Sequence, residues 1–257
     1  MFDLPTLVAA LGPAACRFDA DAVDSCDSTN SRMLARACAG APSGTLLVAG
    51  QQTAGRGRRG RTWYSAPEDS LTFSLLWRFP PASDAPAGVS LAVGLALVKA
   101  LESLGIAGLG LKWPNDVLLD GRKLAGILVE LQPGDTHSLV IGVGLNLRLP
   151  SDLPTEVAGH ASALPLPVGR EILLATLLTS LASVLDAYAQ GGFALLRPAW
   201  ISRHAWQGQT VVVHGERDPV RGRCQGVDTD GALLLETAAG LRRIVGGEVS
   251  LRRAEEP

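Results

Sequence analysis

The stretch from Gly55 to Arg61 reads Gly-Arg-Gly-Arg-Arg-Gly-Arg, and it restricts what the chain can build more than any other segment. Four arginines stand within seven residues, although the whole chain carries 23 Lys and Arg against 25 Asp and Glu. Glycine lets backbone N–H groups approach a ligand closely, and guanidinium groups bind carboxylates and phosphates through paired hydrogen bonds. Clustered arginines also repel one another unless an anion lies between them. We therefore expect an anion-binding loop; a solvated basic loop is the alternative.

This loop matches no complete nucleotide-binding motif. Gly55, Gly57 and Gly60 have the spacing of the dinucleotide fingerprint, but the following residues, Trp63 to Pro67, do not predict the long helix that the fingerprint needs. The Gly-Lys-Ser/Thr ending of a phosphate-binding P-loop is missing as well. The loop therefore predicts anion binding without identifying the anion.

Composition predicts a folded chain with a sizeable core. The chain has 257 residues, of which 47% are hydrophobic, enough for one large domain or a domain with a small appendage. No apolar run approaches the roughly 20 uncharged residues that cross a bilayer, and the first residues lack the basic segment of a secretory signal. The four cysteines lack metal-ligand spacing and are expected to be free thiols. We expect a cytoplasmic protein without a membrane segment.

Periodicity and breaker residues predict an α+β fold. Helices are expected over residues 6–11, 30–38, 86–104 and 170–188. Strands are expected over residues 45–49, 71–77, 110–113, 117–119, 123–131 and 138–146. Ser83 or Asp84 would cap the third helix, and Gly191-Gly192 would end the last. Because strands and helices do not alternate strictly, we predict a mixed, largely antiparallel sheet with helices on one side.

The C-terminal part follows a different rhythm. Residues 149–168 are rich in proline and predict an ordered loop without periodic structure. Residues 208–253 show four or five short strands separated by Gly and Asp turns, which resembles a small β-barrel of the SH3 type. We therefore predict a main domain over residues 1–205 and a small barrel over 206–257.

Two lysines form a second charged constellation. Lys112 stands at a strand end before Trp113-Pro114, and Lys123 lies just past the Asp120-Gly121 turn. That arrangement could bring both ammonium groups to the same end of the sheet. Lysines on a hairpin surface are the alternative, and Asn115-Asp116 could simply form a turn.

Five motifs occur in one order along residues 25–150, and together they resemble the signature of biotin–protein ligases. They are Ser28-Thr29-Asn30, Gln52–Arg58, Lys112–Asp116, Lys123–Glu130 and Gly142–Asn146. Residues 208–253 resemble the C-terminal SH3-like domain of that family. The resemblance implies a class II synthetase-like catalytic domain followed by this barrel.

The resemblance also implies a reaction. Family members join biotin and ATP to biotinyl-5′-AMP, releasing pyrophosphate, and then transfer the biotinyl group to a lysine of a carrier protein. Here the carrier would be the biotin carboxyl carrier protein domain of acetyl-CoA carboxylase or of another biotin-dependent carboxylase. Mg²⁺ is the expected metal, with Asp116 as its candidate ligand, and a homodimer is compatible with the family.

Site residues follow from the same resemblance, motif by motif. The catalytic cations would be Arg58, Lys112 and Lys123. The biotin-binding residues would be Ser28, Thr29, Asn30, Gln52, Gly55, Arg56, Gly57, Arg58, Lys123, Gly126 and Gly144. The ATP-binding residues would be Arg56, Arg58, Arg61, Trp63, Lys112, Asn115 and Asn146. Simple helix capping by Ser28 and a core position for Trp63 remain the alternatives at those two places.

Two departures from the family pattern are visible. Only 27 residues precede Ser28, fewer than the roughly 50 of an independent domain, so we expect a stand-alone ligase without the repressor domain of some members. Residues 149–168 lack the tryptophan that some members fold over adenine.

Three other functions compete with this interpretation. A lipoate–protein ligase or octanoyl transferase shares the catalytic fold, but no cysteine nucleophile stands near Lys123. A nucleic-acid-binding regulator conflicts with a net charge of −2. A vitamin-binding protein without catalysis would not need two lysines in addition to four arginines.

Overall fold

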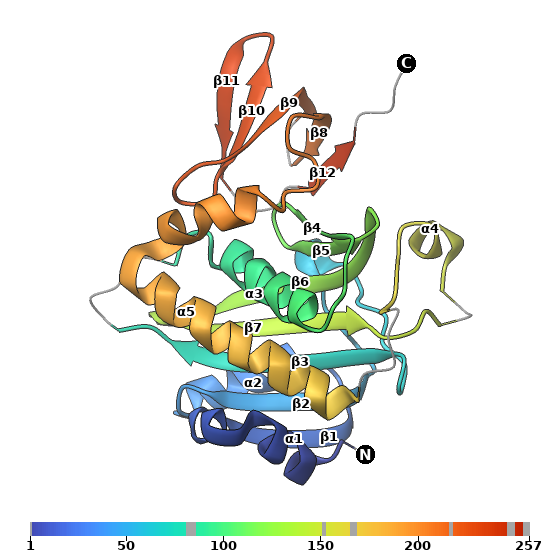
Figure 1. The fold of residues 1–257 in the computed structure, drawn as a ribbon, viewed down its shortest axis with the longest axis vertical. Helices are drawn as coiled ribbons and strands as arrows, with labels where there is room; N and C mark the ends of the chain where they lie inside the picture. Colours follow the sequence, from blue (N-terminus) through green and yellow to red (C-terminus); the bar gives the residue numbers. More distant parts are fainter. Residues whose placement is uncertain are drawn as a thin grey trace.

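The computed structural model describes residues 2–80, 86–150, 153–164, 169–215, 218–245 and 250–253. Among these residues the strands form two sheets, a large mixed one and a small antiparallel one that lies at the top of Figure 1. The large sheet has the order β1-β2-β3-β7-β6-β5-β4. Its strands are β1 Asp19–Cys26, β2 Thr45–Gln52, β3 Ser70–Arg78, β4 Leu109–Lys112, β5 Asp116–Leu119, β6 Arg122–Gln132 and β7 Asp135–Asn146.

The small sheet has the order β11-β10-β9-β8-β12. Its strands are β8 Thr210–His214, β9 Val220–Val227, β10 Leu233–Thr237, β11 Gly240–Ile244 and β12 Ser250–Arg253. The helices are α1 Leu4–Leu11, α2 Thr29–Cys38, α3 Val89–Ser103, α4 Thr155–Ala158 and α5 Arg170–Ile201, with 3₁₀ turns at Gly12–Arg17 and Arg58–Gly60. The predicted α+β class, with a mixed sheet followed by a small β module, is confirmed.

The hairpin of β6 and β7 forms the centre of the large sheet. Its register places Gly126 opposite Gly144 and Leu128 opposite Gly142. All neighbouring strands in this sheet run antiparallel except β1 and β2, which run parallel. Glycine contributes no side chain to a sheet surface, so this register leaves a bare strip along the middle of the hairpin.

Helices cover both faces of the large sheet. The main hydrophobic core lies under α3 and α5, which cross the sheet in Figure 1, and α1 packs beside α5. Alternation along β2 turns Leu47 to the opposite face, where it packs with Met33 of α2 in a second, smaller cluster. The prediction of helices on one side thus holds for α1, α3 and α5. Helix α2, which was also predicted, lies on the other face.

Several element boundaries differ from prediction for identifiable reasons. The strand β1 was not predicted, because it is a partly exposed edge strand that begins with alternating Asp and Ala, two residues with low strand propensity. The predicted end of the last helix at Gly191-Gly192 is a bend. These two residues have φ of −144° and 61°, and α5 continues beyond them to Ile201. The predicted cap at Ser83 or Asp84 lies outside the described residues, and α3 begins after Gly88. The predicted loop contains the short helix α4.

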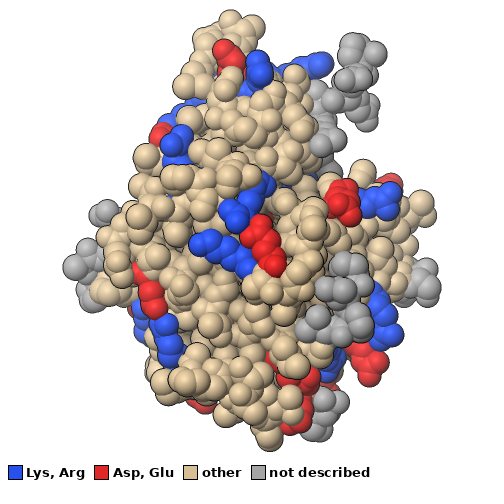
Figure 2. Space-filling view, viewed as in Figure 1, with Lys and Arg blue, Asp and Glu red and all other residues tan. Residues whose placement is uncertain are grey.

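By length and composition alone, α5 is apolar enough to cross a bilayer. Within the protein, however, its Leu173, Leu177, Leu181 and Leu185 side chains are buried against the core. The face of the molecule in Figure 2, along which α5 runs, shows few charged side chains, and they occur in small groups of both signs. The helix therefore has the burial pattern of a core helix.

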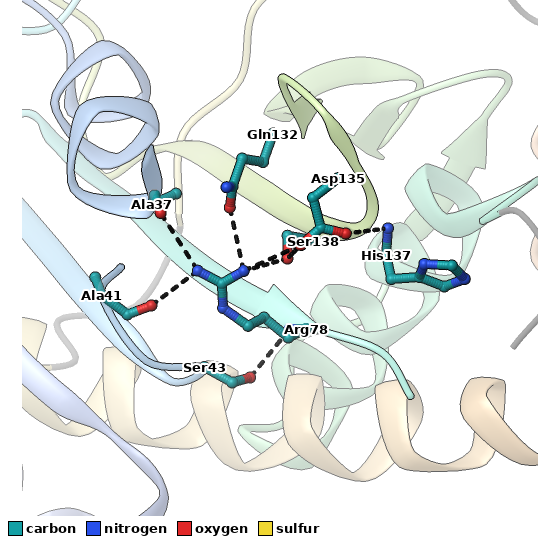
Figure 3. A network of polar contacts seen from close by, with 8 residues as sticks. All are labelled: Ala37, Ala41, Ser43, Arg78, Gln132, Asp135, His137 and Ser138. Atoms are coloured by element: carbon teal, nitrogen blue, oxygen red, sulfur yellow. Dashed lines mark hydrogen bonds and ion pairs between the residues drawn. The ribbon is translucent and has the colours of Figure 1, made fainter. Parts of the chain in front are cut away.

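Arg78 joins the end of β3 to two other parts of the fold (Figure 3). Its guanidinium donates to the carbonyl oxygen of Ala37 (3.4 Å), in the last turn of α2, and to that of Ala41 (2.9 Å), just after the helix. It also pairs with Asp135 (3.2 Å) and donates to Ser138 at the β6–β7 turn. This one side chain therefore fixes the C-terminal end of α2 on the sheet.

Replacing Arg78 should destabilise the fold. Arg78→Met keeps the apolar stem but removes the donor that Gln132 Oε1 and Ala41 O share, so we expect a loss of about 2 kcal/mol in the free energy of unfolding. Urea denaturation measures it. The control is Arg148→Met, whose side chain is 65% exposed while it pairs with Asp69, and which should change the stability by less than about 1 kcal/mol. Equal unfolding midpoints for the two variants would contradict the anchoring role.

His204 lies at the junction between the two sheets. Its ring stacks on Trp200 at 4.7 Å, its Nδ1 faces Gln207 (3.4 Å) and Cys224 (3.9 Å), and its buried Nε2 has no hydrogen-bond partner among the described residues. Burial lowers its pKa from 6.5 to about 4, against the smaller opposing effect of Gln207. The histidine is therefore neutral in the folded protein.

This neutral histidine predicts a pH-dependent stability. Below pH 6.5 the unfolded chain gains a proton that the folded chain takes up only near pH 4, so acidification across that window should cost about 3 kcal/mol of unfolding free energy. Above pH 6.5 this contribution is constant. Denaturation of wild type and His204→Gln at several pH values isolates it, because the variant should lack this slope. Parallel pH profiles for the two proteins would refute it.

Candidate functional site

One large cavity, of about 1010 Å³, lies over the β6–β7 hairpin and extends to the small sheet. The Arg-rich loop, the N-terminus of α2 and the ends of β4 and β5 form its walls. They include most of the predicted site residues: Ser28, Thr29, Asn30, Gln52, Arg56, Gly57, Arg58, Arg61, Trp63, Lys112, Asn115, Asp116, Lys123, Gly126 and Gly144. The fold thus brings together residues from widely separated motifs.

The first wall consists of neutral polar groups at the start of α2. Ser28 caps the helix, accepting from the backbone N–H of Ser31 at 3.5 Å. Gln52 Oε1 accepts from the backbone N–H of Thr29 at 2.7 Å and from its hydroxyl at 3.0 Å. Ser28, Thr29 and Asn30 are all buried. Capping and a binding role are therefore compatible, since Ser28 caps the helix and also lines the cavity with Thr29 and Asn30.

The second wall is the Arg-rich loop, which is held by its own backbone. Gly57 N donates to Arg61 O at 2.7 Å, and Trp63 N donates to Gly55 O at 2.9 Å. Arg59 adopts a left-handed conformation with φ of 60° at the tip. Arg58 reaches inward and donates to Asn115 Oδ1 at 3.3 Å. The loop is thus a turned-back segment that presents guanidinium groups to the cavity.

The third wall is a charged cluster around Asp116. Lys123 Nζ lies 2.7 Å from Asp116 Oδ1, and Lys112 Nζ lies 3.8 Å from Asp116 Oδ2. Burial tends to raise the pKa of the Asp116 carboxyl, but the charges of Lys123 and Lys112 hold it below its ordinary value. The prediction that the two lysines meet at one end of the sheet is confirmed. The cluster carries more positive than negative charge and suits an anion.

Trp63 covers the glycine strip. A Cβ built on Gly144 would lie 2.2 Å from Trp63 Cε2, and one on Gly126 would lie 3.0 Å from Cζ3. The Trp63 indole therefore covers these two glycines, which were both predicted to bind biotin. Trp63 Nε1 is buried without a hydrogen-bond partner among the described residues, so a ligand that brings an acceptor there would gain a hydrogen bond.

Two predicted site residues do not line the cavity. Gly55 is buried where a Cβ would lie 2.4 Å from the carbonyl oxygen of Trp63, so it serves the close packing of the loop. Asn146 donates to the carbonyl oxygens of Ser162 (3.0 Å) and Lys123 (3.4 Å), and thereby joins the segment after α4 to β6. The predicted contact of Asn146 with adenine therefore lacks a place in this cavity.

Sequence reasoning missed the contribution of the small sheet. Val212, His214 and Arg221 line the cavity, and the Trp206 ring lies 4.7 Å from Lys112 Nζ. No local motif signals these residues, because their position depends on how the small sheet docks. Glu130 lies in the motif Lys123–Glu130, but the sequence analysis assigned it no function. A carboxylate inside the apolar run of β6 is nevertheless unusual enough to indicate one.

The close contact between Trp63 and Gly144 yields a prediction. Gly144→Ala should push the indole off the sheet, because the methyl group would overlap the ring. With 5-fluorotryptophan in the protein, ¹⁹F NMR should show the Trp63 signal, assigned through Trp63→Phe, moving toward a solvent-exposed shift. The control is Gly169→Ala, where a Cβ meets nothing closer than 3.9 Å. An unmoved Trp63 signal in Gly144→Ala would contradict this packing of the indole on the sheet.

Comparison with known proteins places the chain in a family. Residues 23–146 match the Biotin/lipoate A/B protein ligase family, and residues 208–252 match the Biotin protein ligase C terminal domain. The chain is 36% identical over 237 residues to the biotin--[acetyl-CoA-carboxylase] ligase of Paracoccus denitrificans, covering 87% of this chain and 96% of that one. It is also 36% identical over 236 residues to the bifunctional ligase/repressor BirA of Escherichia coli, covering 90% and 73%.

A solved structure agrees in fold. The biotin protein ligase of Aquifex aeolicus in complex with biotin and ATP superposes with a TM-score of 0.81 at 30% identity, covering 92% of this chain and 99% of that chain. Sequence motifs, both domain matches and the shared architecture lead to one conclusion: the chain belongs to the biotin protein ligase family and is a ligase.

Proposed function

We propose that this chain condenses biotin and ATP to biotinyl-5′-AMP and then transfers the biotinyl group to one lysine of a biotin carboxyl carrier protein. The observation that carries the proposal is the order of groups along β6. Lys123 is the second residue of the strand, Gly126 follows, and the carbonyl oxygen of Leu128 accepts a hydrogen bond from Asn30 further along. Five residues of strand span about 16 Å, so a cationic end and a neutral polar end are separated by a bare strip. An elongated ligand with a polar head and an anionic tail fits that order.

The neutral end would bind the ureido head of biotin. Such a group needs a few fixed hydrogen bonds and no charge. Thr29 and Gln52 are already held by each other, so they would bind without a cost of reorientation. The apolar bicycle and the valeryl chain would lie in the cavity beside the Trp63 indole, which itself covers Gly126 and Gly144.

The cationic end would serve the chemical step. A biotin carboxylate oxygen attacks the α-phosphorus of ATP, a new C–O–P bond forms, and the bond to the bridging oxygen of the leaving pyrophosphate breaks. Negative charge increases on the phosphoryl oxygens and the leaving group. Lys123, Lys112 and Arg58 already surround one buried carboxylate, so their charges are oriented before the substrates arrive. Fixed charges of this kind lower a barrier without reorganisation.

Mg²⁺ belongs to the proposal only as a companion of the ATP phosphates. The candidate ligand Asp116 has its two oxygens facing the ammonium groups of Lys123 and Lys112. Among the described residues no group of three His, Cys, Asp or Glu side chains could hold a metal ion. The side chains present therefore do not fit a magnesium site built by the protein, and the proposed reaction assigns no step to one.

The transfer step requires an open route for a carrier lysine. Its amine would attack the biotinyl carbonyl and AMP would leave. The side of the cavity lined by His214 and Arg221 is the place we propose for carrier docking. A carrier domain of acetyl-CoA carboxylase is supported by the name of the Paracoccus denitrificans relative. Action without DNA, a homodimer and a cytoplasmic location stay predictions; sedimentation in solution would test the dimer.

Lipoate ligation is the rival that shares this fold. A transferase of that family with a thiol nucleophile would need a cysteine at the site. All four cysteines lie in the described part of the chain and none of them lines the cavity; Cys26 and Cys224 are buried elsewhere. This argues against a thiol-dependent transferase, and biotin is supported over lipoate by the names of the Paracoccus denitrificans and Aquifex aeolicus relatives.

Adenylate formation tests the proposal directly. The protein is incubated with ATP labelled at the α-phosphate, Mg²⁺ and either biotin or lipoate, and labelled biotinyl-AMP is expected only with biotin. Lys123→Met should lower the rate about 10²–10³-fold, because one oriented cation is lost where charge develops. The control Lys99→Met changes a lysine of α3 that does not line the cavity. Turnover with lipoate at least equal to that with biotin would overturn the function, and a normal rate for folded Lys123→Met would overturn the role of this residue.

A further inference from the structure

Glu130 places a carboxylate in the run Ile127–Leu131 of β6, whose other residues are apolar. Its side chain is only 23% exposed, and neither neighbour along the strand, Val129 nor Leu131, is polar. Carboxylates are rarely placed in such surroundings unless both oxygens are engaged. Here both are, and their partners belong to two different walls of the cavity.

One carboxylate oxygen fixes the amide of Asn30. Asn30 Nδ2 donates to Glu130 Oε2 at 2.8 Å and to Leu128 O at 3.2 Å. Asn30 Oδ1 lies 2.6 Å from the Ser74 hydroxyl, which donates to it. An ionised carboxylate only accepts hydrogen bonds, so a reversed amide would set its oxygen against two other acceptors. Glu130 therefore fixes the orientation of the Asn30 amide: Nδ2 points to Glu130 and Leu128, and Oδ1 points to Ser74 as an acceptor.

The other carboxylate oxygen holds the Arg-rich loop. Glu130 Oε1 pairs with the Arg56 guanidinium, whose Nη1 also donates to Ser31 Oγ at 3.0 Å. Arg56 in turn pairs through its backbone with Thr62 on the returning arm of the loop. A single side chain of the sheet is thus bonded to the loop and to the polar end of the cavity at once.

We propose that Glu130 is a positioning residue that couples closure of the Arg-rich loop to the orientation of the Asn30 amide, and so controls biotin binding. The proposal rests on the proposed function. With Nδ2 fully used, Asn30 offers a lone pair of Oδ1, so this position selects an N–H donor such as a ureido nitrogen. Glu130 touches neither the Lys112–Asp116–Lys123 cluster nor, in this arrangement, the reacting atoms. Its influence should therefore fall on binding and leave the chemical step nearly unchanged.

The test uses Glu130→Gln, which keeps the size of the side chain and removes its charge. Gln can donate to Asn30 Oδ1, so the reversed amide becomes less unfavourable, although Leu128 O still favours the native orientation, and the ion pair with Arg56 is lost. In steady-state adenylate formation we expect the KM for biotin to rise at least tenfold, with kcat and the KM for ATP changed less than threefold. The matched control is Glu102→Gln, which breaks a carboxylate–arginine pair with Arg203 away from the cavity.

A second measurement follows the loop without any ligand. Limited trypsin digestion should cut the Arg-rich loop at least fivefold faster in Glu130→Gln than in wild type or Glu102→Gln. Arg56→Met should accelerate the cuts at the remaining arginines in the same way, and it serves where Glu130→Gln fails to fold. Combining Glu130→Gln with Asn30→Ala should raise the KM for biotin less than the product of the two single effects.

The outcomes separate the two proposals. If wild type forms no biotinyl-AMP, the proposed function fails, while the digestion rates still measure the coupling of loop and sheet. A normal KM for biotin in folded Glu130→Gln would overturn the positioning role. A fall in kcat at constant KM would do the same, as would unchanged cutting of the loop.

Discussion

Three glycines of the β6–β7 hairpin set the depth of the cavity, and the other walls depend on them. Side chains at Gly126, Gly142 and Gly144 would occupy the space that the Trp63 indole and the Asn30 amide now fill; a Cβ on Gly142 would lie 2.2 Å from Asn30 Oδ1. The register pairs Gly126 with Gly144, and Gly142 lies two residues further along β7, opposite Leu128. Helix α2 and the Arg-rich loop can therefore both lie directly on the sheet, one at each end of the strip.

Two acidic side chains keep a strongly cationic cavity folded before any ligand enters. Asp116 lies between the ammonium groups of Lys112 and Lys123, and Glu130 pairs with Arg56. Without these carboxylates the clustered cations would repel one another across a partly buried space. The two differ in consequence: Asp116 sits where phosphate charge would arrive, whereas Glu130 sits beyond the neutral polar end. Asp116 would therefore affect the chemical step, and Glu130 the geometry of the polar binding end.

Sequence reasoning found the large-scale architecture and most cavity residues because both depend on local order. Apolar periodicity predicted the central strands and α3, and turn residues predicted the lysine hairpin. The edge strand β1 was missed because it pairs with β2 although its Asp and Ala residues have low strand propensity. Trp206 and Arg221 were missed because only the docking of the small sheet brings them to the cavity. The ATP-binding role of Asn146 stays a prediction; its amide bonds two backbone carbonyls and does not line the cavity.

The packing of α1 on α5 also has a consequence for how the chain assembles during synthesis. Asp3 N bonds to Glu171 at 3.1 Å and Arg17 pairs with Asp186 at 2.8 Å, contacts that join residues 168 and 169 positions apart. At roughly 5–20 residues per second, the ribosome needs on the order of ten to thirty seconds between making the first partner and the second. Throughout that interval the apolar side of α1, with Leu7 and Leu11, has no helix to cover it. Helix α1, made well before α5, is thus among the last elements of this fold to become native.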